Sequence, residues 1–176
     1  EPGLIHLDYP ETIEAVTYNG DTHTVLVTAN STVIGLGDIT VLYNGTEVPP
    51  VDAGTYQVSV SIKEGENFNA TVDAIPIGTL TVNKAEPTLA LLTVTPTLPV
   101  SYEYGQIIEE IQATPAEGVI GLGAITVKYN ESTDVPTKKN TYLVNASIDE
   151  GKNYLGAELH LGILTITGRQ IEQPTI

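Results

Sequence analysis

The chain has 176 residues, of which 22 are Asp or Glu and 7 are Lys or Arg, so its formal net charge is −15. An acidic surface disfavours nucleic acid and anionic lipid, because both bind basic faces. The absence of cysteine excludes disulfide bonds and thiol catalysis. We interpret the acidic charge as a source of solubility and of repulsion between neighbouring modules.

The sequence contains an internal repeat, which determines how the rest is interpreted. The stretch Val33–Gly37 returns as Val119–Gly123, with the same order of Val, Ile, Gly, Leu and Gly. Later matches follow in the same order: Thr55–Tyr56 with Thr141–Tyr142, and Gly78–Val82 with Gly162–Ile166. This pattern predicts two tandem domains, residues 1–85 and 86–172, with residues 173–176 as the start of a following repeat or a tail.

Apolar and polar residues alternate in several short segments of each repeat, which is the period of a half-buried strand. In the first repeat these segments lie around Val25, at Ile39–Tyr43, at Tyr56–Ile62 and from Ile77 to Val82. The second repeat keeps the same alternation. Asn44-Gly45 predicts a tight turn after the Tyr43 strand.

The last segment of each repeat changes the parity of its apolar residues at a glycine, Gly78 or Gly162. Such a change predicts a β-bulge, because one extra residue reverses which face each side chain meets. Gln106–Ile111 resembles a helical turn, but its counterpart Gly20–Val25 does not. We therefore predict strand in both, and an all-β fold of antiparallel sandwiches or barrels.

The segment Asp52–Tyr56 resembles the tyrosine corner of immunoglobulin-like domains, in which a tyrosine hydroxyl caps the turn into a central strand. The second repeat departs from this pattern, since Lys138 stands in place of the aspartate and Asn140 in place of the glycine. A structural role is predicted for Asp52, Gly54, Tyr56 and Tyr142.

Four elements in a fixed order extend the resemblance over nearly the whole chain. They are Tyr18–Gly20 with Tyr104-Gly105, the Asp52–Tyr56 segment, Asn67-Phe68 with Asn153-Tyr154, and Leu80–Ala85. Together they resemble the tandem immunoglobulin-like repeats, of MBG type, of bacterial cell-surface proteins and adhesins. The resemblance implies two tandem immunoglobulin-like antiparallel β-sandwiches, displayed outside the cell and without catalytic activity. Some mucus-binding repeats instead have a β-grasp fold, which is the alternative.

The sequence offers little for catalysis or for a cofactor. His6, His23 and His160 do not recur between the repeats, and a zinc site needs several such ligands together. The close pair Glu64 and Glu66 is not retained, because Lys152 replaces the second carboxylate. We predict that the chain is not an enzyme and needs no cofactor. Calcium is the weaker alternative, with candidate oxygen ligands at Asp21, Asp52, Glu64 and Glu66.

Three functional hypotheses follow. The first is a non-catalytic stalk or spacer in cell adhesion, extracellular and at the cell surface, whose partners are neighbouring repeats. The second is that the repeats themselves bind a host mucin, glycan or matrix protein. The third is an accessory region of a large secreted enzyme. None of them involves nucleic acid or membrane insertion. The candidate binding patch, which could equally be a buried crossing loop, consists of Val33, Ile34, Leu36, Val119, Ile120 and Leu122.

Overall fold

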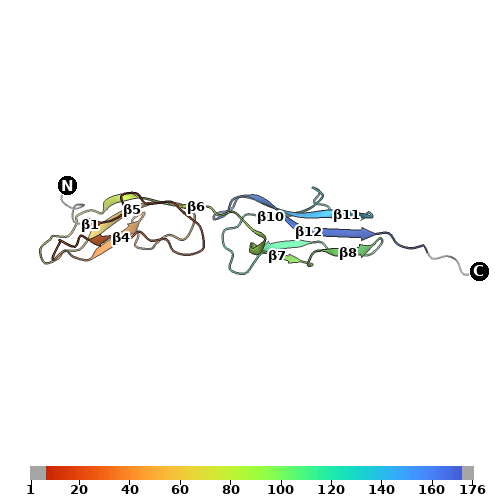
Figure 1. The fold of residues 1–176 in the computed structure, drawn as a ribbon, viewed down its shortest axis with the longest axis horizontal. Coiled ribbons are helices and arrows are strands. Elements are labelled where there is room, and N and C mark those ends of the chain that lie inside the picture. The colour runs from red at the N-terminus through yellow and green to blue at the C-terminus, as the bar shows by residue number, and fades with distance from the viewer. Residues whose placement is uncertain (1–6, 172–176) are drawn as a thin grey trace, which may run out of the picture. The chain divides into compact units, whose positions relative to one another are not determined.

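The computed structural model describes residues 7–171, and within them the protein is all-β (Figure 1). The chain divides into two compact units, Glu1–Ala85 and Glu86–Ile176. The helical content of the described part is a three-residue 3₁₀ turn, Leu89–Leu91. The prediction of an all-β chain of two tandem domains is confirmed, and the described residues contain no helix of the kind that packs on a β-grasp sheet. Residues 173–176, predicted to start a further repeat, lie outside the described residues.

The first repeat consists of a four-stranded and a two-stranded sheet. The larger sheet has the order β2 (Val16–Thr17), β6 (Ile75–Asn83), β5 (Gly54–Ile62), β4 (Ile39–Tyr43). The smaller sheet pairs β1 (Leu7–Asp8) with β3 (Thr28–Ala29). Leu7 of the smaller sheet packs in one core cluster with Val60 and Ile62 of the larger. The two sheets therefore form the two layers of a sandwich.

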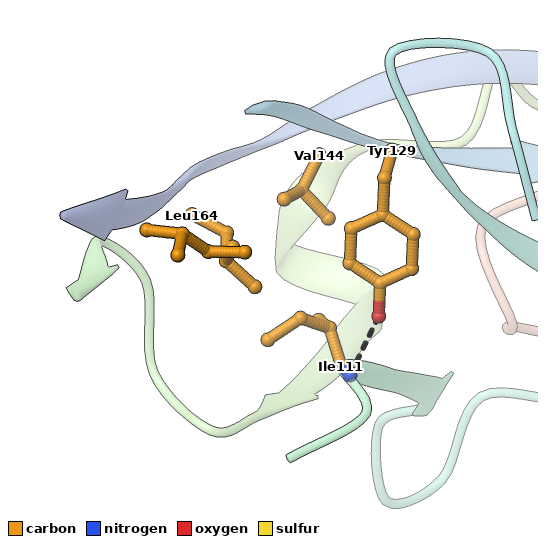
Figure 2. Close-up of a cluster of buried hydrophobic side chains, with 5 residues drawn as sticks. Ile111, Tyr129, Val144 and Leu164 are labelled. Atoms are coloured by element: carbon orange, nitrogen blue, oxygen red, sulfur yellow. Dashed lines mark hydrogen bonds between the residues drawn. The ribbon is translucent and has the colours of Figure 1, made fainter. Parts of the chain in front are cut away.

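The second repeat has the same arrangement (Figure 1). Its larger sheet has the order β8 (Val100–Glu103), β12 (Ala157–Thr167), β11 (Asn140–Ile148), β10 (Ile125–Tyr129). Its smaller sheet pairs β7 (Leu92–Thr95) with β9 (Gln112–Pro115). The sheets enclose a core of Ile111, Tyr129, Val144, Leu164 and Ile166 (Figure 2).

One pairing in each repeat departs from the predicted antiparallel arrangement. β2 runs parallel to β6, and β8 runs parallel to β12. In each four-stranded sheet these two strands are neighbours in space but the first and last in chain order. A long stretch of chain therefore separates them, and no hairpin turn dictates their relative direction. The alternation of apolar residues reports which face is buried and carries no information on strand direction, which is why the sequence did not reveal the parallel pairs.

Both predicted bulges are confirmed. In the first repeat the register between β5 and β6 shifts after Val58, which lies opposite Gly78. In the second the shift follows Val144, which lies opposite Gly162. The two glycines have φ angles of 156° and 147°. A side chain at either position would be strained, because L residues rarely adopt such angles.

The predicted tight turn is also confirmed. Asn44 and Gly45 have φ angles of 49° and 80°, and the backbone of Tyr43 exchanges hydrogen bonds with that of Thr46. Positive φ at both central residues is the geometry of a type I′ turn. The second repeat forms the same turn with Asn130 at 44° and Glu131 at 72°. Glu131 therefore occupies a conformation that favours glycine.

The strand predicted over Gln106–Ile111 and over its counterpart Gly20–Val25 was wrong in both repeats. Both segments are irregular, because β9 begins only at Gln112 and β3 only at Thr28. At the end of the Gln106–Ile111 segment, the backbone hydrogen bond is made to a tyrosine side chain and not to a neighbouring strand. The backbone N–H of Ile111 donates a hydrogen bond of 2.9 Å to the Tyr129 hydroxyl (Figure 2). In the first repeat the Val25 N–H donates in the same way to the Tyr43 hydroxyl, at 2.7 Å.

Candidate functional site

The predicted patch is partly buried in each repeat. Val33 and Leu36 are half-buried, as are their counterparts Val119 and Leu122. The isoleucine between them projects outward, with Ile34 exposed to 77% and Ile120 to 66%. The segment is thus a loop that packs against the repeat and exposes one apolar side chain in both copies.

An asparagine fixes this loop to the turn that follows the central strand. The Asn67 backbone N–H donates to the Gly35 carbonyl, and its side-chain Nδ2 donates to the Ile34 carbonyl, both at 3.0 Å. In the second repeat Asn153 makes the same two bonds, to Gly121 at 3.0 Å and to Ile120 at 3.3 Å. We call this arrangement the asparagine clamp.

The glycines of the loop are required by the close approach of the two backbones. A Cβ at Gly35 would lie 2.5 Å from the Asn67 amide nitrogen, closer than real Cβ atoms approach. A Cβ at Gly37 would collide with the Lys63 carbonyl, and one at Gly65 with the Gly35 carbonyl. The strong match between the repeats in this segment therefore reflects a structural joint, from which the exposed isoleucine projects.

The two tyrosines of the corner motif each cap the turn before the central strand. The Tyr56 hydroxyl donates to the Asp52 carbonyl, and the Tyr142 hydroxyl donates to the Lys138 carbonyl, both at 2.8 Å. Because the acceptor is the backbone, the exchange of aspartate for lysine leaves this bond intact. Gly54 lies against the ring, where a Cβ would be 3.3 Å from the Tyr56 hydroxyl.

The candidate calcium ligands lie on three separate loops of the first repeat, around Asp21, at Asp52 and at Glu64 with Glu66. Asp21 is exposed and its carboxylate accepts a hydrogen bond from Asn19, while Glu64 and Glu66 are exposed beyond β5. Within residues 7–171 no group of three or more His, Asp or Glu side chains is placed to hold a metal ion. His160 lies on β12, where its Nδ1 is 3.0 Å from the Asn145 side-chain oxygen.

One feature of the second repeat was missed in the sequence. A cavity of about 750 Å³, open to solvent, lies at one end of the repeat. It is lined by exposed residues: Tyr104, Lys138, Lys139, Gly168, Arg169, Gln170 and Ile171. Three of the chain's 7 Lys and Arg residues are in this lining. The signal available in the sequence was the exchange of Asp52 for Lys138, which reverses the charge at a matched position.

In the described part of the chain, no helix has the length and apolar character needed to cross a membrane. A family model described as the MBG domain matches residues 12–86 and 100–169, which fall in the first and second repeats. No curated protein and no solved structure matches the chain.

Proposed function

The chain belongs to the MBG domain family, a non-catalytic repeat type that occurs in surface proteins, and from this premise we propose that it is an extracellular spacer in cell adhesion. In this role the tandem repeats hold a binding region away from the cell surface. If the repeats instead accompany a large secreted enzyme, they would serve as its accessory spacer and not in adhesion.

The observation that carries the proposal is that the repeats share their interior and differ on their outward faces. On the central strands, Gln57 of the first repeat lies opposite Thr79, and the two side chains are 3.4 Å apart. The matching pair in the second repeat is Leu143 opposite Ile163, both exposed. A ligand bound by every repeat would need the same outward groups, whereas a spacer needs only a stable core.

The parallel pairs suit a module that is pulled from its two ends. In the second repeat β8 lies near the N-terminal end of the repeat and β12 at its C-terminal end. The two strands are paired in parallel over four residue pairs. Tension applied through the chain ends draws parallel strands past each other, so their hydrogen bonds are loaded together. Antiparallel neighbours pulled from one shared end separate one bond after another.

Single-molecule stretching tests this role. The chain has no cysteine, so introduced cysteines define where force is applied. We expect two unfolding events when the full chain is pulled from its ends. The control, Asn140→Cys with Gly168→Cys, grips β11 and β12 at the end they share. It should open at a clearly lower force. Equal forces in the two geometries would contradict a role in bearing tension.

The exposed isoleucine favours a second candidate function, direct binding by both repeats. Ile34 and Ile120 retain the same side chain in the same exposed position, held by the asparagine clamp. The test is binding of the chain to mucins, glycans and matrix proteins, with Ile34→Thr and Ile120→Thr combined. Leu26→Thr with Ile107→Thr is the matched control, since it removes one exposed apolar side chain from each repeat. Saturable binding lost only in the isoleucine variant would establish this function.

A further inference from the structure

The cavity of the second repeat lies at one end of the larger sheet, where the strand directions bring three chain segments together. β8 and β12 are parallel, so both end there, at Glu103 and Thr167. β11 is antiparallel to β12 and therefore begins there, at Asn140. The residues just beyond these ends are the ones that line the cavity. Rigid strands thus position a site whose members are far apart in the sequence.

The lining is strongly basic for so acidic a chain. Lys138, Lys139 and Arg169 lie together in a molecule whose net charge is −15. Among residues 7–171 none of the three forms an ion pair with a carboxylate. Three cations without an ion pair to any described carboxylate, gathered around one cavity of about 750 Å³, favour the binding of an anionic group.

Contacts with neighbouring groups position the two lysines. The Tyr142 hydroxyl bonds to the Lys138 carbonyl at 2.8 Å, which fixes the turn that carries both lysines. The Lys139 side chain runs along the backbone of Gly168, where an added Cβ would lie 3.4 Å from its Nζ. The tyrosine corner therefore also positions the basic side of the cavity.

An aromatic ring forms another part of the lining. The Tyr104 side chain is 55% exposed, and its backbone N–H donates to the Thr167 carbonyl at 2.9 Å. A half-exposed tyrosine offers an apolar ring face together with a polar hydroxyl, and both suit a ligand that is partly apolar and partly hydrated. The amide of Gln170 adds donors and an acceptor beside it.

We propose that this cavity binds an acidic sugar unit of a glycan, one that carries a carboxylate or a sulfate. The cations would bind the acidic group, with the arginine able to form paired hydrogen bonds to its oxygens, and the Tyr104 ring would pack against the sugar. An extended polyanion or a second copy of this chain fits less well, because the net charge of −15 repels a large acidic body. A single acidic sugar mainly meets the cations within a screening length of about 8 Å.

The site belongs to the second repeat alone. At the positions matching Lys138, Lys139 and Arg169 the first repeat has Asp52, Ala53 and Ala85. The proposal is thus independent of the spacer role, and loss of one would leave the other standing.

The test is calorimetric titration of the full chain with four probes: sialyllactose, a sulfated heparin disaccharide, neutral lactose and sodium sulfate. We expect one site for the acidic sugars and none for lactose. Lys138→Gln with Lys139→Gln should weaken binding about tenfold or more. Lys63→Gln with Lys152→Gln is the matched control, because it removes the same charge elsewhere, and its affinity should equal that of the unmodified chain. Tyr104→Ala should weaken the sugars and leave sulfate unchanged.

Other outcomes would overturn the proposal. Failure of both acidic sugars to bind the folded chain would do so directly. Equal weakening by the control pair would show attraction to charge in general rather than to a site. If Tyr104→Ala left the sugars unaffected, or if sodium sulfate bound as tightly as the acidic sugars, the site would be for anions in general and not for sugars.

Discussion

The two repeats differ at the end of the larger sheet where the last strand finishes. There the first repeat has a buried tyrosine, Tyr18 (8% exposed), and an acidic residue, Asp52. The second repeat has an exposed tyrosine, Tyr104 (55% exposed), and a basic residue, Lys138. In both repeats the backbone N–H of this tyrosine bonds to the last residue of the final strand. The Tyr18 N–H donates to the Asn83 carbonyl at 2.8 Å, as the Tyr104 N–H does to Thr167. One framework therefore supports opposite surfaces, because its stability rests on buried groups and backbone bonds that the surface residues do not alter.

The largest expected effect on stability comes from the asparagine clamp, whose asparagine differs in burial between the two repeats. Asn153 is fully buried, whereas Asn67 is exposed, although both make the same two bonds. Asn153→Ala should destabilise the second repeat by about 3 kcal/mol, since buried groups lose their partners, and Asn67→Ala should cost the first about 1 kcal/mol. Urea unfolding of each variant measures both effects. Equal losses would show that burial does not set the strength of the clamp.

The buried tyrosine hydroxyl comes next. Tyr129→Phe leaves the Ile111 N–H without its partner inside the core, and we expect a loss of about 2 kcal/mol. Tyr43→Phe should cost the first repeat a similar amount, because Val25 N–H donates to it in the same way. Thermal unfolding followed by circular dichroism measures both. Hydrogen exchange at Ile111 should also become faster, and unchanged protection there would contradict the role of the bond.

The tight turns differ in strain, and exchanging their residues sharpens the comparison. Glu131→Gly should stabilise the second repeat by about 1 kcal/mol, because glycine adopts a φ of 72° without the penalty paid by glutamate. The reciprocal change Gly45→Glu should destabilise the first repeat by about the same amount. Chemical denaturation of the two single variants and of the double variant tests this, and the two effects should cancel in the double.

The smallest effect concerns pH. Burial raises the pKa of the Tyr129 hydroxyl above its usual value of 10.0, and the nearby Glu110 carboxylate adds to the rise, although the bond from Ile111 opposes it. The folded state thus holds this proton more tightly than the unfolded state. The contribution is complete below pH 10 and is lost as the pH rises through the folded pKa. Denaturation from pH 9 to about 11 should show the decline, and Tyr129→Phe should lessen it.

The longer strands, the bulges and the tight turn after Tyr43 could be predicted because they depend on local pattern, whereas the strands expected around Val25 and Ile111 are irregular. The alternation of Val58, Val60 and Ile62 reports one buried face, and the parity change at Gly78 reports an extra residue. The parallel pairs could not, because they join segments that no turn connects. The sequence likewise did not show that a side chain would satisfy the N–H of Ile111.

The candidate sites divide in the same way. The loop with Ile34 and Ile120 was found through repetition, but its dependence on the asparagine clamp required the distances between the backbones. The basic cavity was missed because Tyr104, Lys138 and Arg169 meet only through the order of the strands. Aligning the repeats reveals the residues that they share, whereas the basic residues of this cavity are present in the second repeat only.

The tight turn after the Tyr43 strand has a consequence for how the molecule ages. Asparagine followed by glycine loses its side-chain amide most readily, because the unhindered glycine nitrogen can attack that side chain, and asparagine is among the thermolabile residues. The first repeat contains this sequence twice, at Asn19-Gly20 and at Asn44-Gly45, where a 2.8 Å bond from the Gln57 N–H restrains the Asn44 side chain. With Glu131 in place of the glycine, the second repeat exchanges conformational ease for chemical durability. Spontaneous deamidation should therefore mark the first repeat long before the second.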